Sequence, residues 1–384
     1  MTDPDVFGAL VVGAGVNGLA TAWHLVRLGC PRVALVERFR IGHDRGSSHG
    51  HSRITRSSYR HQTYVRLMQV AHGEEWPRLE RDSGTALVHR QDGVFFGPTG
   101  GPFEDYAASV AAVGVDVERI DVAQARQRFP LFRFPDAAGV LHDRTGGVIA
   151  AAAAIDALAK RCWIEGVHVL EDTEVVGIDP VGDAIAVATD RGKLLAERVV
   201  VTAGAWTARL LPSLAARLVV KRQSVGFFAV DAPAEAIGVG RFPVWAYLGG
   251  GPNGLRYGLP EFGRPGLKAA LHEESGVPDD PDARPGPDAR LLDGIRAFLD
   301  EQLAVRVGET LHAETCLFTS TASEDFVIDT LPGHPRVVVG SACSGHGFKF
   351  GPLTGRILAE LALHGRSSVD AFEANRAQFA ITAR

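Results

Sequence analysis

A glycine-rich turn near the start of the chain is the feature that most constrains its fold. Gly13, Gly15 and Gly18 fall at the G-x-G-x-x-G spacing, after an apolar run from Phe7 to Val12 and before a helix-like stretch from Leu19 to Leu28. In a nucleotide-binding βαβ unit, the first glycine permits the tight turn, the second lets the backbone approach a pyrophosphate, and the third lets the helix pack close to the strand. The N-terminus of that helix then faces the phosphate charge. The pattern therefore predicts a Rossmann-like dinucleotide site.

A second strand and an acid complete this unit. The apolar segment Val33–Val36 ends in Glu37, about 20 residues after Gly18, where a carboxylate can bind a ribose hydroxyl. The alternative is a glycine-rich turn in another α/β fold. The complete unit favours dinucleotide binding over that alternative, although it does not distinguish FAD from NAD.

Composition excludes several classes of protein. The net charge of −5 gives no general attraction to nucleic acid. No segment approaches the roughly 18 uninterrupted apolar residues of a membrane span, and the first residues lack the basic and apolar regions of a secretory signal. We therefore expect a cytoplasmic protein with no nucleic-acid or membrane partner. The cysteines form no C-x-x-C pair and no zinc-like cluster, so we expect free thiols and no metal site; they are Cys30, Cys162, Cys316 and Cys343.

A polar segment, residues 42–56, follows the second strand. It is rich in glycines and cations, and it lies where ligands gather in a nucleotide-binding domain. Arg53 and Arg56 are three positions apart, so a helical turn would place both on one face, toward an anionic ligand. The alternative is a solvated surface loop, and spacing alone leaves the two interpretations equal.

A second glycine-rich turn lies near the C-terminus. The strand Val337–Gly340 leads into residues 341–351, and a helix follows from Pro352 to Leu363. Such a backbone can lie against a flat ligand, and its helix end can offset negative charge.

The middle of the chain predicts a second unit interleaved with the first. Residues 86–147 and 219–316 are rich in short strands and turns, unlike the first unit. We therefore assign residues 1–85, 148–218 and 317–384 to the nucleotide-binding domain, and residues 86–147 and 219–316 to a substrate domain. Two helices are expected in the first domain, Tyr64–Leu79 with a kink at Pro77, and Ile149–Trp163.

Five motifs together resemble the monomeric sarcosine oxidase family of flavoproteins, over nearly the whole chain. They are Gly-Ser-Ser-His-Gly-His-Ser-Arg-Ile-Thr-Arg at 46–56, Ala-Gly-Ala-Trp at 203–206, Gly-Leu-Lys at 266–268 with His272, Glu-Thr-Cys at 314–316, and Ser-Gly-His-Gly-Phe-Lys-Phe at 344–350. The resemblance implies an α/β fold, with a Rossmann-like FAD-binding domain interleaved with an α+β substrate domain on a mostly antiparallel sheet. It also implies a monomer that oxidises N-methyl amino acids with FAD and reduces O₂ to hydrogen peroxide.

The resemblance implies where FAD binds. Cys316 matches the cysteine that holds the flavin 8α-methyl as a thioether; Cys343 is the rival, although it does not match the family's site. The alternative for Cys316 is a buried core thiol. The residues expected at the cofactor are Gly13, Gly15, Gly18, Glu37, Ser47, Arg53, Val175, Trp206, Cys316, Gly345, His346, Gly347, Phe348 and Lys349.

The resemblance also implies catalytic roles. Arg56 and Lys349 match the pair that holds the substrate carboxylate, which needs charge-assisted partners when it leaves water. Lys268 matches a lysine associated with oxygen activation, where a fixed ammonium stabilises negative charge on O₂. Arg53 and His49 match residues beside the flavin, and Arg53 can stabilise the anionic reduced ring. Tyr257 and His272 match the substrate-side pair that shapes the site and tunes the protonation of the amine.

One residue departs from the family pattern. Phe318 stands two positions after the attachment cysteine, where the sarcosine oxidases carry tyrosine. Sarcosine (N-methylglycine) remains the expected substrate, with hydride transfer to flavin N5, reoxidation by O₂ and hydrolysis of the imine. The alternatives are the same chemistry on N-methyltryptophan, pipecolate, proline or a glycated amino acid, a flavin dehydrogenase with another electron acceptor, or an NAD-linked or non-catalytic protein.

Overall fold

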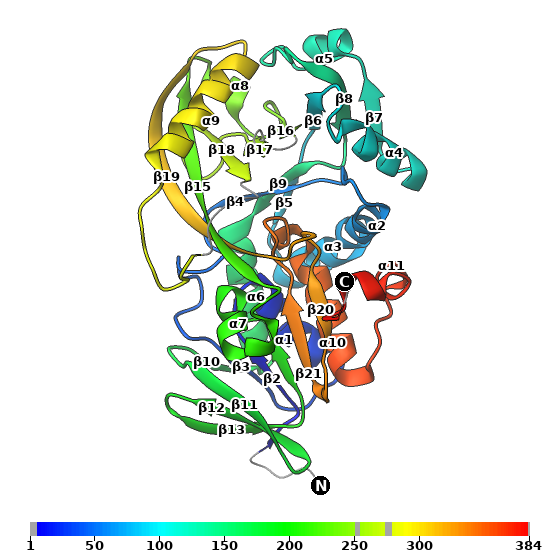
Figure 1. The fold of residues 1–384 in the computed structure, drawn as a ribbon, viewed down its shortest axis with the longest axis vertical. Helices are drawn as coiled ribbons and strands as arrows, with labels where there is room; N and C mark the ends of the chain where they lie inside the picture. The colour runs from blue at the N-terminus through cyan, green and yellow to red at the C-terminus, as the bar shows by residue number, and fades with distance from the viewer. Residues whose placement is uncertain (1–5, 250–253, 273–278, 383–384) are drawn as a thin grey trace.

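A six-stranded sheet forms the lower half of the molecule (Figure 1). The computed structural model describes residues 6–249, 254–272 and 279–382. The sheet's first five strands are parallel and the last is antiparallel to its neighbour. In spatial order they are β10 (His168–Leu170), β3 (Val33–Val36), β2 (Ala9–Val12), β14 (Val199–Val201), β21 (His334–Ser341) and β20 (Val327–Leu331).

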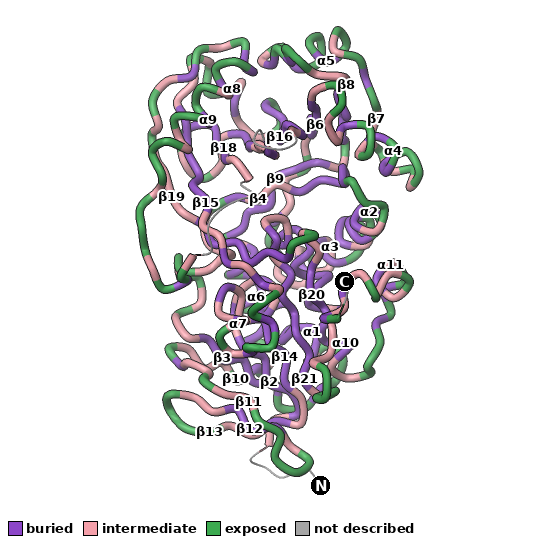
Figure 2. The backbone as a smooth tube through the Cα atoms, viewed as in Figure 1, coloured by how far each residue is buried: buried purple, intermediate pink, exposed green. Residues whose placement is uncertain are grey.

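The central strands are short valine-rich runs because both faces of the sheet are covered. Figure 2 shows β2, β14 and β21 as a buried centre. The helices α1 (Val16–Arg27), α6 (Ala151–Ile164) and α10 (Gly351–His364) pack beside the sheet. Helices α1 and α10 approach closely, since a Cβ on Gly355 would lie 2.4 Å from the Cβ of Ala20.

The first apolar run divides between two sheets at Gly8. Val6–Phe7 (β1) joins a four-stranded sheet, whereas β2 enters the six-stranded sheet. A Cβ at Gly8 would lie 2.3 Å from the carbonyl oxygen of Pro31, so a side chain there would force the backbones apart. The other strands of the small sheet are β13 (Gly192–Ala196), β12 (Ala184–Thr189) and β11 (Val175–Val181).

An eight-stranded sheet forms the upper half of the molecule (Figure 1). Its neighbours pair antiparallel except β16 with β6. The strands are, in order, β19 (Val307–Ser320), β15 (Val219–Val230), β18 (Leu267–His272), β17 (Leu255–Leu259), β16 (Val244–Leu248), β6 (Gly93–Pro98), β8 (Ala137–Asp143) and β7 (Val117–Ile120). The long strands β15 and β19 descend toward the lower sheet. The predicted fold class is therefore confirmed.

A small three-stranded sheet lies between the two halves. Its strand pairing shows that two of the predictions from sequence are wrong. Its strands are β4 (Ser52–Thr55), β9 (Gly147–Ala150) and β5 (Val88–Arg90). Arg53 is therefore in a strand, and the predicted helical turn joining it to Arg56 is wrong, because β4 pairs with β9. The helix predicted from Ile149 begins two residues later, because Ile149 pairs with Arg53.

The helix predicted over residues 64–79 is a composite. It comprises α2 (Gln62–Val70), a π-helical segment η1 (Ala71–Glu75) and α3 (Trp76–Ser83). The predicted kink at Pro77 is wrong, because Pro77 lies in the first turn of α3, where its missing N–H is tolerated. The irregularity is the π-helical segment.

The remaining helices are short or lie at the edges of the sheets. None of the helices in the part of the chain that the structure describes is long and apolar enough to cross a membrane. They are α4 (Phe103–Val113), α5 (Val122–Arg128), η2 (Gly204–Trp206), α7 (Thr207–Leu210), η3 (Pro212–Leu214), α8 (Ala234–Ile237), α9 (Ala289–Gln302), η5 (Phe348–Phe350), α11 (Asp370–Glu373) and η6 (Arg376–Phe379).

Candidate active site

One cavity of about 620 Å³ extends from the first glycine turn to the eight-stranded sheet. Every predicted site residue except Gly18 lines it. These residues are Gly13, Gly15, Glu37, Ser47, His49, Arg53, Arg56, Val175, Trp206, Tyr257, Lys268, His272, Cys316, Gly345, His346, Gly347, Phe348 and Lys349. Segments more than 300 residues apart thus meet at one site.

The glycine turn has the geometry that its spacing predicts. Gly13 has a φ of +96°, a conformation that L side chains rarely adopt. Gly18 lies behind the turn, where a Cβ would be 1.8 Å from the carbonyl oxygen of Gly13 and 2.6 Å from Thr202 Oγ1. The absence of a side chain at Gly18 therefore allows α1 to pack closely on the strand, whereas Gly13 and Gly15 line the cavity.

Glu37 closes the far end of this turn. It is buried, and its Oε2 accepts a hydrogen bond from the Ala14 amide at 2.7 Å while Oε1 accepts one from the Phe39 amide at 2.9 Å. These bonds hold the carboxylate at the cavity wall, where a ribose would lie.

Trp206 and Val175 line the same end of the cavity. The indole Nε1 of Trp206 donates to Asp282 Oδ1 at 2.9 Å, and Arg38 donates to the same oxygen at 2.9 Å. Asp282 lies in the loop between β18 and α9. This loop, which belongs to the eight-stranded half of the molecule, therefore reaches the nucleotide end of the cavity.

Arg53 organises the polar segment that precedes β4. Its Nη2 donates to the carbonyl oxygens of Ser47 (3.0 Å) and His49 (2.6 Å). Its guanidinium also lies over the Phe348 ring, 5.3 Å from the centroid, and thus links the two glycine-rich turns. Burial lowers the pKa of His49 to about 4, and the charges of Arg53 and Lys268 act in the same direction.

Cys316 lies on β19 beside this segment. Its sulfur is 3.9 Å from the carbonyl oxygen of Ser47, and the Ser47 hydroxyl donates to the Leu317 carbonyl at 2.5 Å. Burial raises the pKa of the Cys316 thiol, and the charges of Arg53 and Lys268 oppose that rise.

Lys268 projects from β18 into the same part of the cavity. Its ammonium donates to the carbonyl oxygen of Ser52 at 3.1 Å and lies 3.8 Å from Glu314 Oε1. Burial and the charge of Arg53 lower the pKa of Lys268 to about 8, whereas Glu314 raises it.

Arg56 and Lys349 are two buried cations that share a partner, Tyr59. Lys349 Nζ donates to Tyr59 Oη at 3.0 Å and to the carbonyl oxygen of His346 at 2.8 Å. The Arg56 guanidinium carbon lies 4.5 Å from the centroid of the Tyr59 ring, and the rings of Phe95 and Tyr106 also face it. Burial and the charge of Arg56 hold the pKa of Lys349 well below its usual value. Two cations held this close favour an anionic ligand.

His272 and Tyr257 form the opposite wall. His272 Nε2 lies 2.6 Å from Glu324 Oε1, and its ring is 5.5 Å from that of Phe318. Glu324 has a φ of +62°, an uncommon value for a non-glycine residue. Burial raises the pKa of the Tyr257 hydroxyl, so this group stays protonated.

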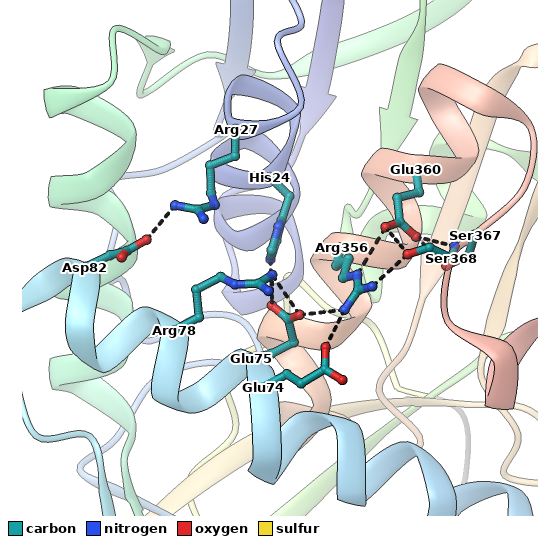
Figure 3. A network of polar contacts seen from close by, with 10 residues as sticks. All are labelled: His24, Arg27, Glu74, Glu75, Arg78, Asp82, Arg356, Glu360, Ser367 and Ser368. Carbon is teal, nitrogen blue, oxygen red and sulfur yellow. Dashed lines mark hydrogen bonds and ion pairs between the residues drawn. The ribbon is translucent and has the colours of Figure 1, made fainter.

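A buried ion cluster lies next to Trp76, which holds the main chain of Lys349. Trp76 Nε1 donates to the carbonyl oxygen of Lys349 at 2.8 Å, and Trp76 directly follows the π-helical segment. In that segment the fully buried Glu75 contacts His24 of α1, Arg78 of α3 and Arg356 of α10 (Figure 3). Burial raises the pKa of Glu75, whereas His24 and the two arginines lower it, and the net shift is downward.

Sequence reasoning missed Tyr59, Glu314 and Glu324. Glu314 carries a detectable signal, because it lies two positions before Cys316 on one strand and therefore shares its face. The role of Tyr59 depends on Lys349, which is 290 residues away in sequence, and no local pattern indicates that contact.

The residues present fit FAD. The cavity passes from a positive-φ glycine turn with an acid at its end, suited to a dinucleotide, to a cationic pocket. Within the described residues, the buried His49 Nε2 has no hydrogen-bond partner, although His49 lines this cavity. A buried polar atom of this kind calls for a ligand partner.

The comparisons with known proteins agree with this geometry. Residues 9–361 match the family described as FAD dependent oxidoreductase. The chain is 35% identical over 376 residues to the peroxisomal sarcosine oxidase of Homo sapiens, covering 95% of this chain and 94% of that protein. It is 31% identical to the monomeric sarcosine oxidase of Bacillus sp. (strain B-0618), with coverage of 95% and 94%. It is 30% identical to the N-methyl-L-tryptophan oxidase of Salmonella enteritidis, with coverage of 95% and 96%.

Solved structures share the fold. NikD, described as an unusual amino acid oxidase essential for nikkomycin biosynthesis, superposes with a TM-score of 0.82 at 27% identity, covering 98% of this chain and 97% of that one. Glycine oxidase from Geobacillus kaustophilus superposes with a TM-score of 0.79 at 19% identity, covering 99% of each chain. The chain therefore belongs to the FAD-dependent oxidoreductase family, in the group that contains the peroxisomal and monomeric sarcosine oxidases.

Proposed function

We propose that this protein is a FAD-dependent oxidase of a small secondary amino acid, with sarcosine as its main substrate. One observation carries the proposal. Two buried cations, Arg56 and Lys349, share the partner Tyr59 at the end of a cavity that begins at a dinucleotide turn. The relatives named as sarcosine oxidases support the choice of substrate.

The two cations would hold the substrate carboxylate. Lys349 has three N–H donors, and Tyr59 and His346 occupy two of them, so one remains for a ligand. Charge-assisted bonds to a carboxylate fix its position, and thereby place the substrate amine and its N-methyl group toward the rest of the cavity.

The charge of the site would select the reactive form of the amine. A secondary amine donates its lone pair only when unprotonated, and an ammonium is disfavoured beside Arg56 and Lys349. Tyr257 and His272 would shape this region and hold the amine in place. When bound, FAD supplies the acceptor for a hydride from the substrate and passes both electrons to O₂, which with two protons becomes hydrogen peroxide.

Lys268, Arg53 and His49 would act on the cofactor side. A fixed ammonium at Lys268 stabilises negative charge that develops on O₂. Arg53, which bridges the two glycine-rich turns, would offset negative charge on the reduced ring. The imine product leaves the protein and is hydrolysed in water.

We also propose that Cys316 holds the flavin covalently. The thiol lines the cavity beside Ser47, where the charges of Arg53 and Lys268 oppose the rise in its pKa that burial causes. Cys343 lines the same cavity and is the rival site of attachment.

The remaining assignments rest on one relative and on the sequence. We propose a monomer, after the relative named monomeric sarcosine oxidase, and a cytoplasmic location, as expected from the sequence. We also propose that residues 1–85, 148–218 and 317–384 form the FAD-binding domain, and residues 86–147 and 219–316 the substrate domain.

A substrate panel tests the activity. Purified protein is given sarcosine, N-methyltryptophan, pipecolate, proline and a fructosyl amino acid, and peroxide release is measured. The highest kcat/KM is expected for sarcosine. Phe318 and the N-methyl-L-tryptophan oxidase relative make a larger N-methyl amino acid the second candidate. Absence of peroxide with every amine would refute the proposal.

A further inference from the structure

We infer that Glu314 is a positioning residue that keeps the Lys268 ammonium charged and aimed into the cavity, and so maintains the reaction with O₂ at neutral and mildly alkaline pH. This inference rests on the proposed function, in which Lys268 acts on O₂. Its evidence is the arrangement of charges on one face of the eight-stranded sheet.

Three adjacent strands bring the pair together. Phe227 on the central strand β15 pairs with Lys268 on β18, and Val225 on β15 pairs with Glu314 on β19. The Lys268 ammonium lies over the Phe227 ring, 5.6 Å from its centroid, and reaches diagonally to within 3.8 Å of Glu314 Oε1. Both residues line the cavity.

Burial and the neighbouring arginines oppose the charge of Lys268. Lys268 is 5% exposed, so it has lost nearly all its hydration. Burial is the largest influence that lowers its pKa, and Arg53 and Arg264 lower it further, whereas Glu314 and the Cys316 thiol raise it. The thiol is held neutral by burial. In the described part of the chain, Glu314 is therefore the anion that acts on Lys268.

Other groups at the site do not replace this carboxylate. His49 is held neutral by its lowered pKa, and burial keeps the Tyr257 hydroxyl protonated. His312 Nε2 is 3.9 Å from Glu314 Oε2, so it contacts the same carboxylate from the outer side. Gly50 leaves room for the carboxylate, since a Cβ there would lie 3.3 Å from Glu314 Oε1 and 3.4 Å from Arg53 Nη1.

Lysine is rare in this chain compared with arginine, so the presence of lysines at the cavity is informative. The sequence has five lysines among 40 lysines and arginines, and both Lys268 and Lys349 line the cavity. Unlike arginine, a buried lysine can lose its proton near neutral pH. At Lys268, the nearby Glu314 carboxylate favours the ammonium form.

The direct test is NMR of the flavin-loaded protein labelled with [ε-¹³C]lysine, which gives five signals: Lys160, Lys193, Lys221, Lys268 and Lys349. Titration of the Lys268 signal is compared between the wild type, Glu314→Gln and Glu314→Asp. We expect Glu314→Gln to lower the titration midpoint of Lys268 by about one pH unit, with Glu314→Asp intermediate. Glu309→Gln, at an exposed glutamate on the same strand, is the matched control. An unchanged Lys268 midpoint in Glu314→Gln would overturn the inference.

A kinetic test separates this inference from the proposed function. The flavin is reduced with dithionite, which requires no amine substrate, and its reoxidation by O₂ is followed by stopped flow. At pH 8, Glu314→Gln should reoxidise about fivefold slower than wild type, and the difference should shrink toward pH 6. The pH profile of anaerobic reduction by sarcosine should be unmoved. A pH-independent loss in reoxidation would overturn the inference. Absence of reduction by any amine would instead refute the proposed function.

Discussion

Replacing Lys349 by methionine removes one charge from the proposed carboxylate clamp and leaves its scaffold in place. Methionine is similar in length to lysine and apolar, and it suits a buried position. The bond from Trp76 goes to the main-chain carbonyl of residue 349, so it does not depend on the side chain. Tyr59 and His346 lose one hydrogen-bond donor.

The size of the effect follows from one lost bond. With two of its three donors occupied, Lys349 contributes one charge-assisted bond to a carboxylate, worth about 2 kcal/mol. A loss of that size weakens carboxylate binding about 30-fold. Arg56 remains, so binding should be weakened and not abolished.

The assay is binding of acetate to the flavoprotein, followed by the change in flavin absorbance. Acetate carries the carboxylate without the reacting amine, so its Kd reports on the clamp alone. The KM for sarcosine should rise in parallel. Lys160→Met, at an exposed lysine of α6, is the control and should leave both values unchanged. If acetate bound Lys349→Met as tightly as it binds the wild type, the proposal that Lys349 holds the substrate carboxylate would be refuted.

Three further predictions concern the cofactor and the fold. Cys316→Ser should release yellow flavin into the supernatant after acid precipitation, whereas Cys343→Ser should keep it in the pellet; the reverse would move the attachment to Cys343. Gly18→Ala should purify with little flavin and a lowered Tm, because the new Cβ would lie 1.8 Å from a main-chain oxygen; normal flavin content would contradict this. Glu75→Gln should destabilise the protein by about 3 kcal/mol at pH 7, because it removes a fully buried carboxylate that pairs with Arg78 and Arg356. Since the folded protein lowers the pKa of Glu75, that difference should shrink as pH falls below 4.5, and a constant difference in denaturant titrations would refute its origin in the ion cluster.

Much of the nucleotide-binding unit follows from local sequence. The strand, turn and helix around Gly13 and Gly18 are determined by neighbouring residues, and the structure reproduces them. The strand Val33–Val36 was predicted for the same reason, since it is a short apolar run buried on both faces.

Errors arose where long-range pairing determines local structure. Ser52–Thr55 is polar and short, and it is a strand because β9 lies beside it. The π-helical segment Ala71–Glu75 holds its glutamate among His24 of α1, Arg78 of α3 and Arg356 of α10, which no local pattern reveals.

The candidate site shows the same division. The resemblance supplied residues that the structure gathers around one cavity, such as Lys268 and Cys316. The spacing from Cys316 indicates which face of the strand Glu314 occupies, but not its contact with Lys268. Tyr59 carries no such signal for its contact with Lys349. Each contact joins strands or turns distant in the chain.

The measurement that most directly tests the central claim is a two-stage experiment on the purified flavoprotein. Sarcosine is added without oxygen, O₂ is then admitted, and flavin absorbance and hydrogen peroxide are followed together. We predict that sarcosine bleaches the flavin, and that O₂ restores the colour with peroxide equimolar to the oxygen consumed. A flavin that sarcosine leaves unbleached, or that is reoxidised only by an added electron carrier, would contradict the account of a secondary amino acid oxidase.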